Sequence, residues 1–233
     1  MNTPETRIAA LKRFDAQVLA AVENRPLDPE TAWIFLALGD TLRRFDIPAQ
    51  LCLDLTDAFA QDVTKRTYET FDEVLDYCRR SANPVGRLVL LLHGLKDETM
   101  FRESDAICSA LQLANFWQDV AVDRKKDKRT YIPLEDLRRF GCTLDDLDRP
   151  EATPAVRECL RFQAERAQRY FDAGKKLPGR LPFPLSLEIR LTRLGGEAIL
   201  KKLREQNYDS LVRRPKLGKA DKVRLLFGAI FSR

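Results

Sequence analysis

The stretch Asp105-Ala-Ile-Cys-Ser-Ala-Leu-Gln-Leu-Ala-Asn-Phe-Trp-Gln-Asp-Val-Ala-Val-Asp123 decides the fold of this chain. Apolar residues cover most of a helix drawn through it, which predicts a buried helix. At about 100° per residue, its polar side chains gather in one stripe, formed by Asp105, Gln112, Asn115, Asp119 and Asp123. A buried carboxylate without a partner is costly. The stripe therefore requires a bound cation, a solvated face or a basic helix beside it, and periodicity alone leaves these alternatives open.

Helical periodicity extends from this stretch in both directions through the 233 residues, without strand alternation. Thr70 is expected to cap a helix over 71–82, and Asp28 with Pro29 to begin a helix that ends before Pro48. The other expected helices cover approximately 4–23, 48–63, 84–92, 98–122, 134–141, 154–173, 185–206 and 219–231. The sequence thus predicts one all-α domain of about ten helices.

The cysteine and histidine content excludes several classes of protein. Five cysteines without a C-x-x-C pair, and a single histidine, leave no basis for a disulfide framework, a zinc site or a metalloprotease motif. A Ser-His-Asp triad would have to use His93, and no Gly-x-Ser-x-Gly turn is present. The apolar runs are shorter than the ~20 residues of a spanning helix, and Met1–Arg25 does not have the pattern of a signal peptide. We expect a cytoplasmic protein that is soluble or peripheral on the membrane.

The net charge of +5 is concentrated at one end of the chain. Val212–Arg233 contains seven basic residues and one acid, which leaves 33 basic and 34 acidic residues elsewhere. A nucleic-acid-binding protein would carry basic charge across its fold, so we expect no nucleic-acid partner. Apolar and basic residues are interleaved over 219–231, which predicts an amphipathic helix on anionic lipid. The alternative is a terminal helix packed on the domain with a solvated basic face.

Asp119 and Asp123 lie four residues apart, so both carboxylates point to the same side of a helix. Mg²⁺ prefers oxygen ligands and is commonly held by one or two carboxylates together with substrate phosphates. Gln112 and Asn115 precede the pair on the same stripe, where their amides could hold a phosphate oxygen or a metal-bound water. The basic stretch 124–129 follows directly and is expected to form a loop that folds over an anion. Together these features indicate a magnesium–diphosphate site.

Three motifs resemble those of the squalene/phytoene synthase family, in that family's order and spacing. The residues 110–123, followed by Arg129-Thr-Tyr-Ile-Pro133, look like its second aspartate-rich motif. The stretch 57–86, which ends in Tyr77-Cys-Arg-Arg-Ser-Ala-Asn-Pro-Val-Gly86, resembles its Tyr-Cys-x-x-Val-Ala-x-x-Val-Gly signature and the segment before it. Gln206-Asn-Tyr208 is similar to its C-terminal segment. The resemblance implies the isoprenoid synthase fold, with the helices around a central apolar cavity.

The same resemblance implies a division of roles among the matching residues. Asp119 and Asp123 would hold Mg²⁺, which neutralises a leaving diphosphate as a Lewis acid. Tyr77 and Tyr208 would shield or orient a carbocation, with ordinary half-buried packing as the alternative. The other matches would bind an isoprenoid diphosphate: Arg66, Gln112, Asn115, Lys126, Arg129 and Tyr131 at its diphosphate end, and Val85, Gly86, Leu88 and Phe116 along its apolar chain.

Two departures from the family pattern bear on activity. Gln118 stands where family enzymes that join two prenyl diphosphates usually have arginine, which argues for altered handling of the diphosphate. The residues around it are similar to a bacterial branch of hopanoid biosynthesis that ionises presqualene diphosphate and quenches the carbocation with water, without NADPH. The family's first aspartate-rich motif is not found in the sequence. We therefore expect the chain to begin about two helices inside the family fold.

These departures leave two alternatives. A phytoene or presqualene diphosphate synthase predicts arginine in place of Gln118. A non-catalytic homologue that acts as an assembly or scaffolding factor would tolerate loss of the first motif, but it would gain nothing from uncompensated buried carboxylates. The favoured interpretation implies an isoprenoid diphosphate substrate, peripheral membrane contact through the basic tail, and contact with other enzymes of the hopanoid pathway.

Overall fold

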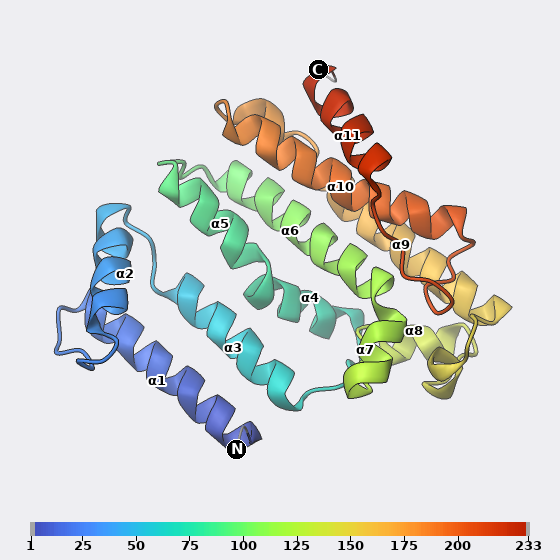
Figure 1. Cartoon of the computed structure of the whole chain (residues 1–233), viewed down its shortest axis with the longest axis horizontal. Helices are drawn as coiled ribbons and strands as arrows, with labels where there is room; N and C mark the ends of the chain where they lie inside the picture. Colours follow the sequence, from blue (N-terminus) through green and yellow to red (C-terminus); the bar gives the residue numbers. More distant parts are fainter. Residues whose placement is uncertain (1–2, 232–233) are drawn as a thin grey trace.

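The computed structural model describes residues 3–231, and this range is helical without any strand, which confirms the predicted all-α class (Figure 1). The α-helices in this range are α1 (Pro4–Val22), α2 (Ala32–Arg44), α3 (Gln50–Thr64), α4 (Phe71–Ser81), α5 (Asn83–Leu92), α6 (Glu98–Gln118), α7 (Val120–Asp127), α8 (Leu134–Arg139), α9 (Pro154–Gly174), α10 (Leu185–Glu205) and α11 (Lys219–Phe231). Two short 3₁₀ turns, η1 (Asp145–Asp148) and η2 (Leu177–Arg180), complete the chain order. None of the described helices is long and apolar enough to cross a membrane.

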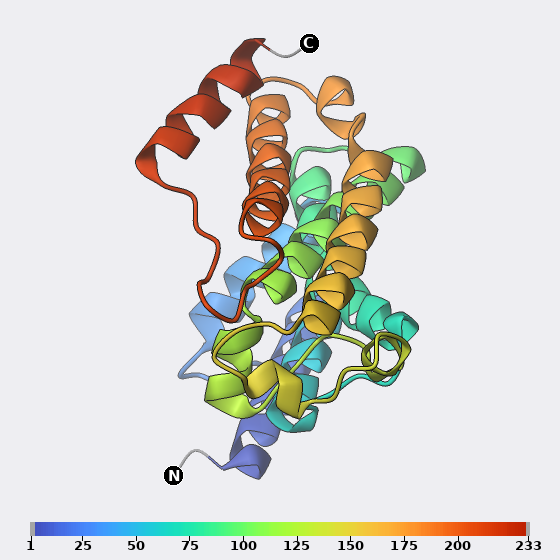
Figure 2. The same ribbon diagram turned by 90° about the vertical axis from the view of Figure 1, so that its right-hand side faces the viewer.

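The helix α6 occupies the centre of the molecule, as its apolar sequence predicts. It packs against α4 and α5 on one side and against α9 and α10 on the other. Figure 2 shows α10 between α9 and α11, so α11 is separated from α6 by another helix. The helices α1 and α2 pack together and join the rest of the molecule through α3.

Glycines on α5 and α9 allow these helices to approach α6 closely. A Cβ atom on Gly174 of α9 would lie 2.5 Å from Cγ1 of Ile107, and one on Gly86 of α5 would lie 2.3 Å from Oγ of Ser104. Both distances are below van der Waals contact, so a larger residue at either position would push the helices apart. Gly86 therefore serves the contact between α5 and α6.

The packed side chains form two clusters with different compositions. One surrounds Trp117 near the C-terminal end of α6 and is rich in aromatic residues. The other joins α1, α2 and α3 to the opposite end of α6 and is largely aliphatic, with Val18, Leu42 and Leu90 among its most buried members. Leu111 contacts both clusters, so α6 links them.

The expected helix over 98–122 is wrong in one respect, because the structure divides it at Asp119. This residue has φ −106° and ψ 11°, outside helical geometry, and α7 continues beyond it to Asp127. The segment 124–129, expected to be a loop, is therefore helical as far as Asp127. The start of the second helix also differs, since the Asp28 carboxylate accepts the N–H of Glu30 in a turn and α2 begins only at Ala32.

Candidate active site

The two carboxylates of the predicted metal site lie at the junction of α6 and α7. Arg214, in the segment that joins α10 to α11, donates from Nε to Oδ1 of Asp119 and from Nη2 to Oδ2 at 2.9 Å. Asn115, one turn earlier on α6, donates to the same Oδ2 at 2.9 Å. The charge of Asp119 is therefore matched inside the protein.

The carboxylate of Asp123, on the first turn of α7, has no ion-pair or hydrogen-bond partner among the described residues. Burial and the neighbouring Asp119 carboxylate raise the pKa of Asp123 to about 6, although Arg129 and Lys126 act against this shift. A raised pKa means that the site disfavours the negative charge. A cation placed between the two carboxylates would relieve that cost.

The residues present fit a magnesium ion held jointly by protein and substrate. The described part of the chain contains no group of three acidic, histidine or cysteine side chains placed to hold a metal. Asp119 and Asp123 supply two oxygen-bearing side chains, and Mg²⁺ typically completes its coordination with waters and substrate phosphates. The donor set thus suits a magnesium–diphosphate pair better than an ion bound by protein alone.

The basic residues that follow Asp123 divide into two groups, which corrects the picture of a single cationic loop. Arg124 is buried and donates from Nε and Nη2 to Asp148 at 3.0 and 2.7 Å, and Lys128 contacts the same carboxylate. These two cations serve the packing of α7 against η1. Lys125 and Lys126 are exposed, so they remain accessible to an anion.

Arg129 turns in the opposite direction, toward α3. Its Nη1 donates to the hydroxyl of Tyr131 at 3.2 Å and lies 3.3 Å from Oδ1 of Asp62, while its Nη2 donates to the Asp62 carbonyl. Its Nε is buried and has no hydrogen-bond partner within the described residues. A buried N–H of this kind normally finds an acceptor, so a ligand oxygen at this position would complete the hydrogen bonding of the guanidinium.

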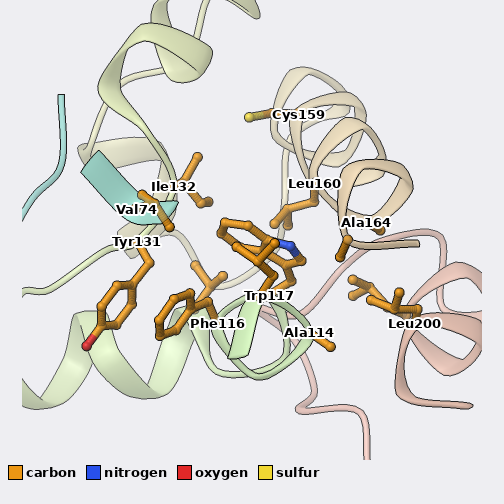
Figure 3. Close-up of a cluster of buried hydrophobic side chains, with 14 of the residues drawn as sticks. Val74, Ala114, Phe116, Trp117, Tyr131, Ile132, Cys159, Leu160, Ala164 and Leu200 are labelled. Carbon is orange, nitrogen blue, oxygen red and sulfur yellow. The ribbon is translucent and has the colours of Figure 1, made fainter. Parts of the chain in front are cut away.

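Three aromatic residues of the Trp117 cluster lie beside these polar residues and form the aromatic wall of the site: Tyr77, Phe116 and Tyr131. The rings of Phe116 and Tyr131 stack with centroids 3.6 Å apart and planes 6° apart, and Tyr77 lies tilted against both. In Figure 3 the Tyr131 hydroxyl points away from Trp117, which is surrounded by Val74, Leu160 and other apolar side chains. Phe116, predicted to line an apolar tunnel, is thus buried in this stack with 4% of its surface exposed.

The other predicted residues occupy different positions. Val85 is half exposed on α5 and remains accessible to an apolar ligand. Gln112 is half-buried on α6, one turn before the exposed Asn115. Arg66 donates to the carbonyls of Asp62 and Val63, so it closes the C-terminal end of α3. These backbone contacts occupy the guanidinium that was predicted to bind the substrate.

Tyr208 lies in the turn after α10, in the left-handed conformation with φ 55°. Its hydroxyl accepts a hydrogen bond from Nε of Arg204 at 3.3 Å. Within the described residues, this hydroxyl makes no hydrogen bond with Asp119 or Asp123. The structure therefore brings Tyr77 into the polar network but leaves Tyr208 outside it.

Two parts of the site were missed by the sequence predictions. One is Asp62, which was noted only as part of a motif. The other is a cavity of about 560 Å³ beside Arg214, lined largely by basic residues: Lys202, Arg213, Arg214 and Lys216, together with Glu205, Gln206 and Pro215. Gln118 holds this segment through a hydrogen bond from Nε2 to the carbonyl of Pro215 at 2.5 Å. The cluster of basic residues after Val212 was the available signal for this cavity.

An all-helical molecule with a carboxylate pair beside a basic cavity and an aromatic wall has the features of an isoprenoid synthase. Comparison with known proteins agrees with this class. The family model for squalene/phytoene synthase matches residues 1–221. The chain therefore belongs to the squalene/phytoene synthase family, which confirms the resemblance seen in its motifs and places it in a family of enzymes.

Individual relatives are similar to different extents. The chain is 34% identical over 229 residues to a hydroxysqualene synthase of Rhodopseudomonas palustris, covering 98% of this chain and 75% of the relative. It is 30% identical over 224 residues to phytoene synthase 2 of Zea mays, covering 92% of this chain and 54% of that protein. The crystal structure of squalene synthase HpnC from Alicyclobacillus acidocaldarius superimposes with a TM-score of 0.80 at 42% identity, covering 86% and 74% of the two chains. A dehydrosqualene synthase at 22% identity shares the fold, with a TM-score of 0.83.

Proposed function

We propose that this chain acts as a hydroxysqualene synthase, which converts presqualene diphosphate and water into hydroxysqualene and diphosphate. The observation that carries the proposal is the carboxylate pair Asp119/Asp123 next to the basic cavity around Arg214. Acidic and basic groups at such close range suit a ligand that combines Mg²⁺ with diphosphate. The similarity to the Rhodopseudomonas palustris enzyme supports this choice of substrate.

The protein groups divide the work of this reaction. Asp119 and Asp123 would hold Mg²⁺, which supplies Lewis-acid neutralisation of the leaving diphosphate when bound. Arg129 offers its unpartnered Nε, and Arg213 and Arg214 offer further donors, to the diphosphate oxygens. The aromatic rings of Tyr77 and its neighbours present electron-rich faces to a carbocation and limit the access of bulk water. No NADPH takes part in this reaction.

A phytoene or presqualene diphosphate synthase is the second candidate, because the chain is also 30% identical to a plant phytoene synthase. Gln118 favours the first candidate. Its amide binds the carbonyl of Pro215 instead of offering a cation to a second diphosphate. A scaffolding role has less support, since the raised pKa of Asp123 indicates a carboxylate that is costly to keep without a ligand.

Product analysis separates these candidates. The purified chain with MgCl₂ is incubated with presqualene diphosphate in one reaction and with farnesyl or geranylgeranyl diphosphate in the others. We expect hydroxysqualene from presqualene diphosphate and no product from the other two. Asp119→Asn should abolish turnover while the helical circular dichroism signal is retained. Unchanged turnover by this variant would reject the site, and condensation of farnesyl or geranylgeranyl diphosphate would favour the second candidate.

We further propose that α11 holds the protein on the inner face of an anionic membrane, close to its lipid substrate. One side of α11 packs on α10, where Ala229 is buried and Lys202 pairs with Asp221 at 2.9 Å. Val223 and Leu226 on the outer side are 55% and 45% exposed. Lys222 and Arg224 lie about 100° to either side of Val223, as in helices that insert an apolar face between lipid headgroups.

Co-sedimentation with vesicles tests the membrane contact. We expect binding to vesicles that contain phosphatidylglycerol and weak binding to phosphatidylcholine alone, because the basic flanks need anionic lipid. The double substitution Val223→Asp and Leu226→Asp should remove the binding. Leu36→Asp on α2, a residue with 60% exposure, is the matched control and should leave it intact. Equal binding by all three proteins would contradict the proposal.

A further inference from the structure

Asp62, near the C-terminal end of α3, connects three segments that are distant in the sequence. Its Oδ2 accepts a hydrogen bond from the hydroxyl of Tyr77 on α4 at 2.7 Å. Its Oδ1 lies 3.4 Å from the hydroxyl of Tyr131 and 3.3 Å from Nη1 of Arg129. The carboxylate thus contacts the hydroxyl groups of Tyr77 and Tyr131 and the guanidinium of Arg129.

The contact with Tyr77 fixes the direction of its hydroxyl group. An ionised carboxylate only accepts hydrogen bonds, so the O–H of Tyr77 points at Asp62. The lone pairs of the phenol oxygen are then left for other groups. The ring itself is held by Tyr68, with centroids 5.8 Å apart, and by Phe116 and Tyr131. Both the plane of the ring and the rotation of the hydroxyl are therefore determined before any substrate binds.

The contacts with Arg129 have a similar effect. The backbone carbonyl of Asp62 accepts from Nη2, its carboxylate lies beside Nη1, and Nε has no partner among the described residues. The Arg129 side chain is 13% exposed, and its guanidinium is held through Nη1 and Nη2. The contacts with Asp62 therefore set the angle at which the buried, unpartnered Nε would meet an acceptor.

A purely structural role would not require this arrangement. Ion pairs in partly buried sites contribute little net stability compared with apolar residues of the same size. Asp62 also retains a quarter of its side-chain exposure, so the network opens toward solvent or a ligand. The charge is better explained by the orientation that it imposes on its partners.

We propose that Asp62 is a positioning residue, which orients the Tyr77 hydroxyl and the Arg129 guanidinium for the reaction at the adjacent carboxylate pair. This inference rests on the proposed function, because the reaction is the process that the orientation serves. Asp62 acts through Tyr77, so its removal should lower kcat more than it raises KM.

A double-mutant cycle with presqualene diphosphate tests the proposal. We expect Asp62→Asn and Tyr77→Phe each to lower kcat by about 10- to 100-fold, with KM changed less than about threefold. The kcat of the double variant should be no lower than that of the less active single variant, because both substitutions remove the same contact. Asp54→Asn is the control: it changes another partly buried aspartate of α3, which contacts Gln50 and Arg79 instead. It should leave kcat unchanged.

A second readout does not depend on turnover. Removing the Asp62 charge should let Tyr77 ionise at lower pH, which is followed by phenolate absorbance near 295 nm during alkaline titration. Burial still raises the pKa of Tyr77 in the variant, and the Asp62 charge also acts on Tyr131, so the readout is a difference: the Asp62→Asn variant should gain more phenolate absorbance at lower pH than the double variant. Multiplicative kcat losses in the cycle, or identical titrations of the two variants, would overturn the proposal. Absence of turnover by the unsubstituted protein would reject the proposed function instead.

Discussion

The aspartates at the ends of α3 and α6 differ in how their charge is balanced. Asp62 is surrounded by donors from Tyr77, Tyr131 and Arg129. At the junction of α6 and α7, Arg214 pairs with Asp119. Asp123 has no such partner, and burial together with the Asp119 charge raises its pKa to about 6. A carboxylate with its partners inside the protein can orient those partners. A carboxylate without them is ready to bind a cation.

The two arginines of the basic stretch 124–129 follow the same distinction. Arg124 uses its donors on Asp148 and on backbone carbonyls, and it is 6% exposed. Arg129 is also largely buried, yet its Nε has no partner in the described part of the chain. The unpartnered Nε of Arg129 thus distinguishes this arginine from Arg124, whose donors are used inside the protein.

The largest expected effect comes from Asp123→Asn. Turnover should fall by at least about 100-fold, because the variant removes one of two carboxylates that would hold Mg²⁺. The free energy of unfolding without metal should rise at pH 7.5 by roughly 1 kcal/mol, since a carboxylate with a raised pKa is removed and partial exposure screens the gain. Urea unfolding and steady-state kinetics measure both changes. Asp145→Asn, at an exposed position in η1, should alter neither. A lower free energy of unfolding for Asp123→Asn would contradict the conclusion that the charge of Asp123 is not balanced inside the protein.

The pH dependence of metal binding gives the next effect. Because protonated Asp123 cannot bind a cation, Mg²⁺ affinity should fall as the pH drops through about 6, by about tenfold between pH 7 and pH 5. Without metal, the stability of the fold depends on pH in the opposite direction to the Mg²⁺ affinity. Folding raises this pKa, so the folded state takes up the proton first and the contribution of Asp123 to stability increases over the same fall in pH. Calorimetric titration with MgCl₂ measures the affinity, and Asp123→Asn should flatten its pH dependence.

Arg214→Ala should strengthen Mg²⁺ binding, and by no more than the change in affinity expected from pH. Its guanidinium pairs with Asp119 and competes with a cation, so Mg²⁺ should bind about three- to tenfold more tightly to the variant. Inorganic diphosphate should bind more weakly, because a donor of the basic cavity is lost. Arg213→Ala is the comparison variant. It should weaken diphosphate binding while leaving Mg²⁺ affinity unchanged, and equal Mg²⁺ affinities for both variants would argue against the competition.

The smallest effects distinguish the two tyrosines bound to Asp62. The 2.7 Å contact of Tyr77 is a strong charged hydrogen bond, so Tyr77→Phe should cost about 1–2 kcal/mol of unfolding free energy. The 3.4 Å contact of Tyr131 is long, and Tyr131→Phe should cost less than about 0.5 kcal/mol. Denaturant unfolding of the two variants measures the difference. A reversed order would show that Asp62 is held mainly by Tyr131.

Several features could be predicted from the sequence because they depend on neighbours within a few turns. The Thr70 side chain accepts the N–H of Glu73, as the cap predicted, and the bounds expected for α1, α9, α10 and α11 agree with the structure to within about a turn. The four-residue spacing of Asp119 and Asp123 predicted that both point to one side of a continuous helix, but α6 ends at Gln118 and Asp123 lies on α7. Helical periodicity and capping are local properties, and they require no knowledge of the packed molecule.

The choice of charge partners was decided only by the tertiary structure. Arg214 reaches Asp119 across 95 residues of sequence, and Arg129 reaches Asp62 across 67. Arg124 and Arg129 are five residues apart in one basic stretch, but the packing of α7 on η1 directs the first to Asp148 and leaves the second facing α3. Electrostatic interactions depend on distance in space and on burial, which the spacing of residues along the chain does not determine. The sequence by itself therefore determined the helices and the kinds of groups available, whereas the packing decided which of those groups are balanced and which remain available to bind.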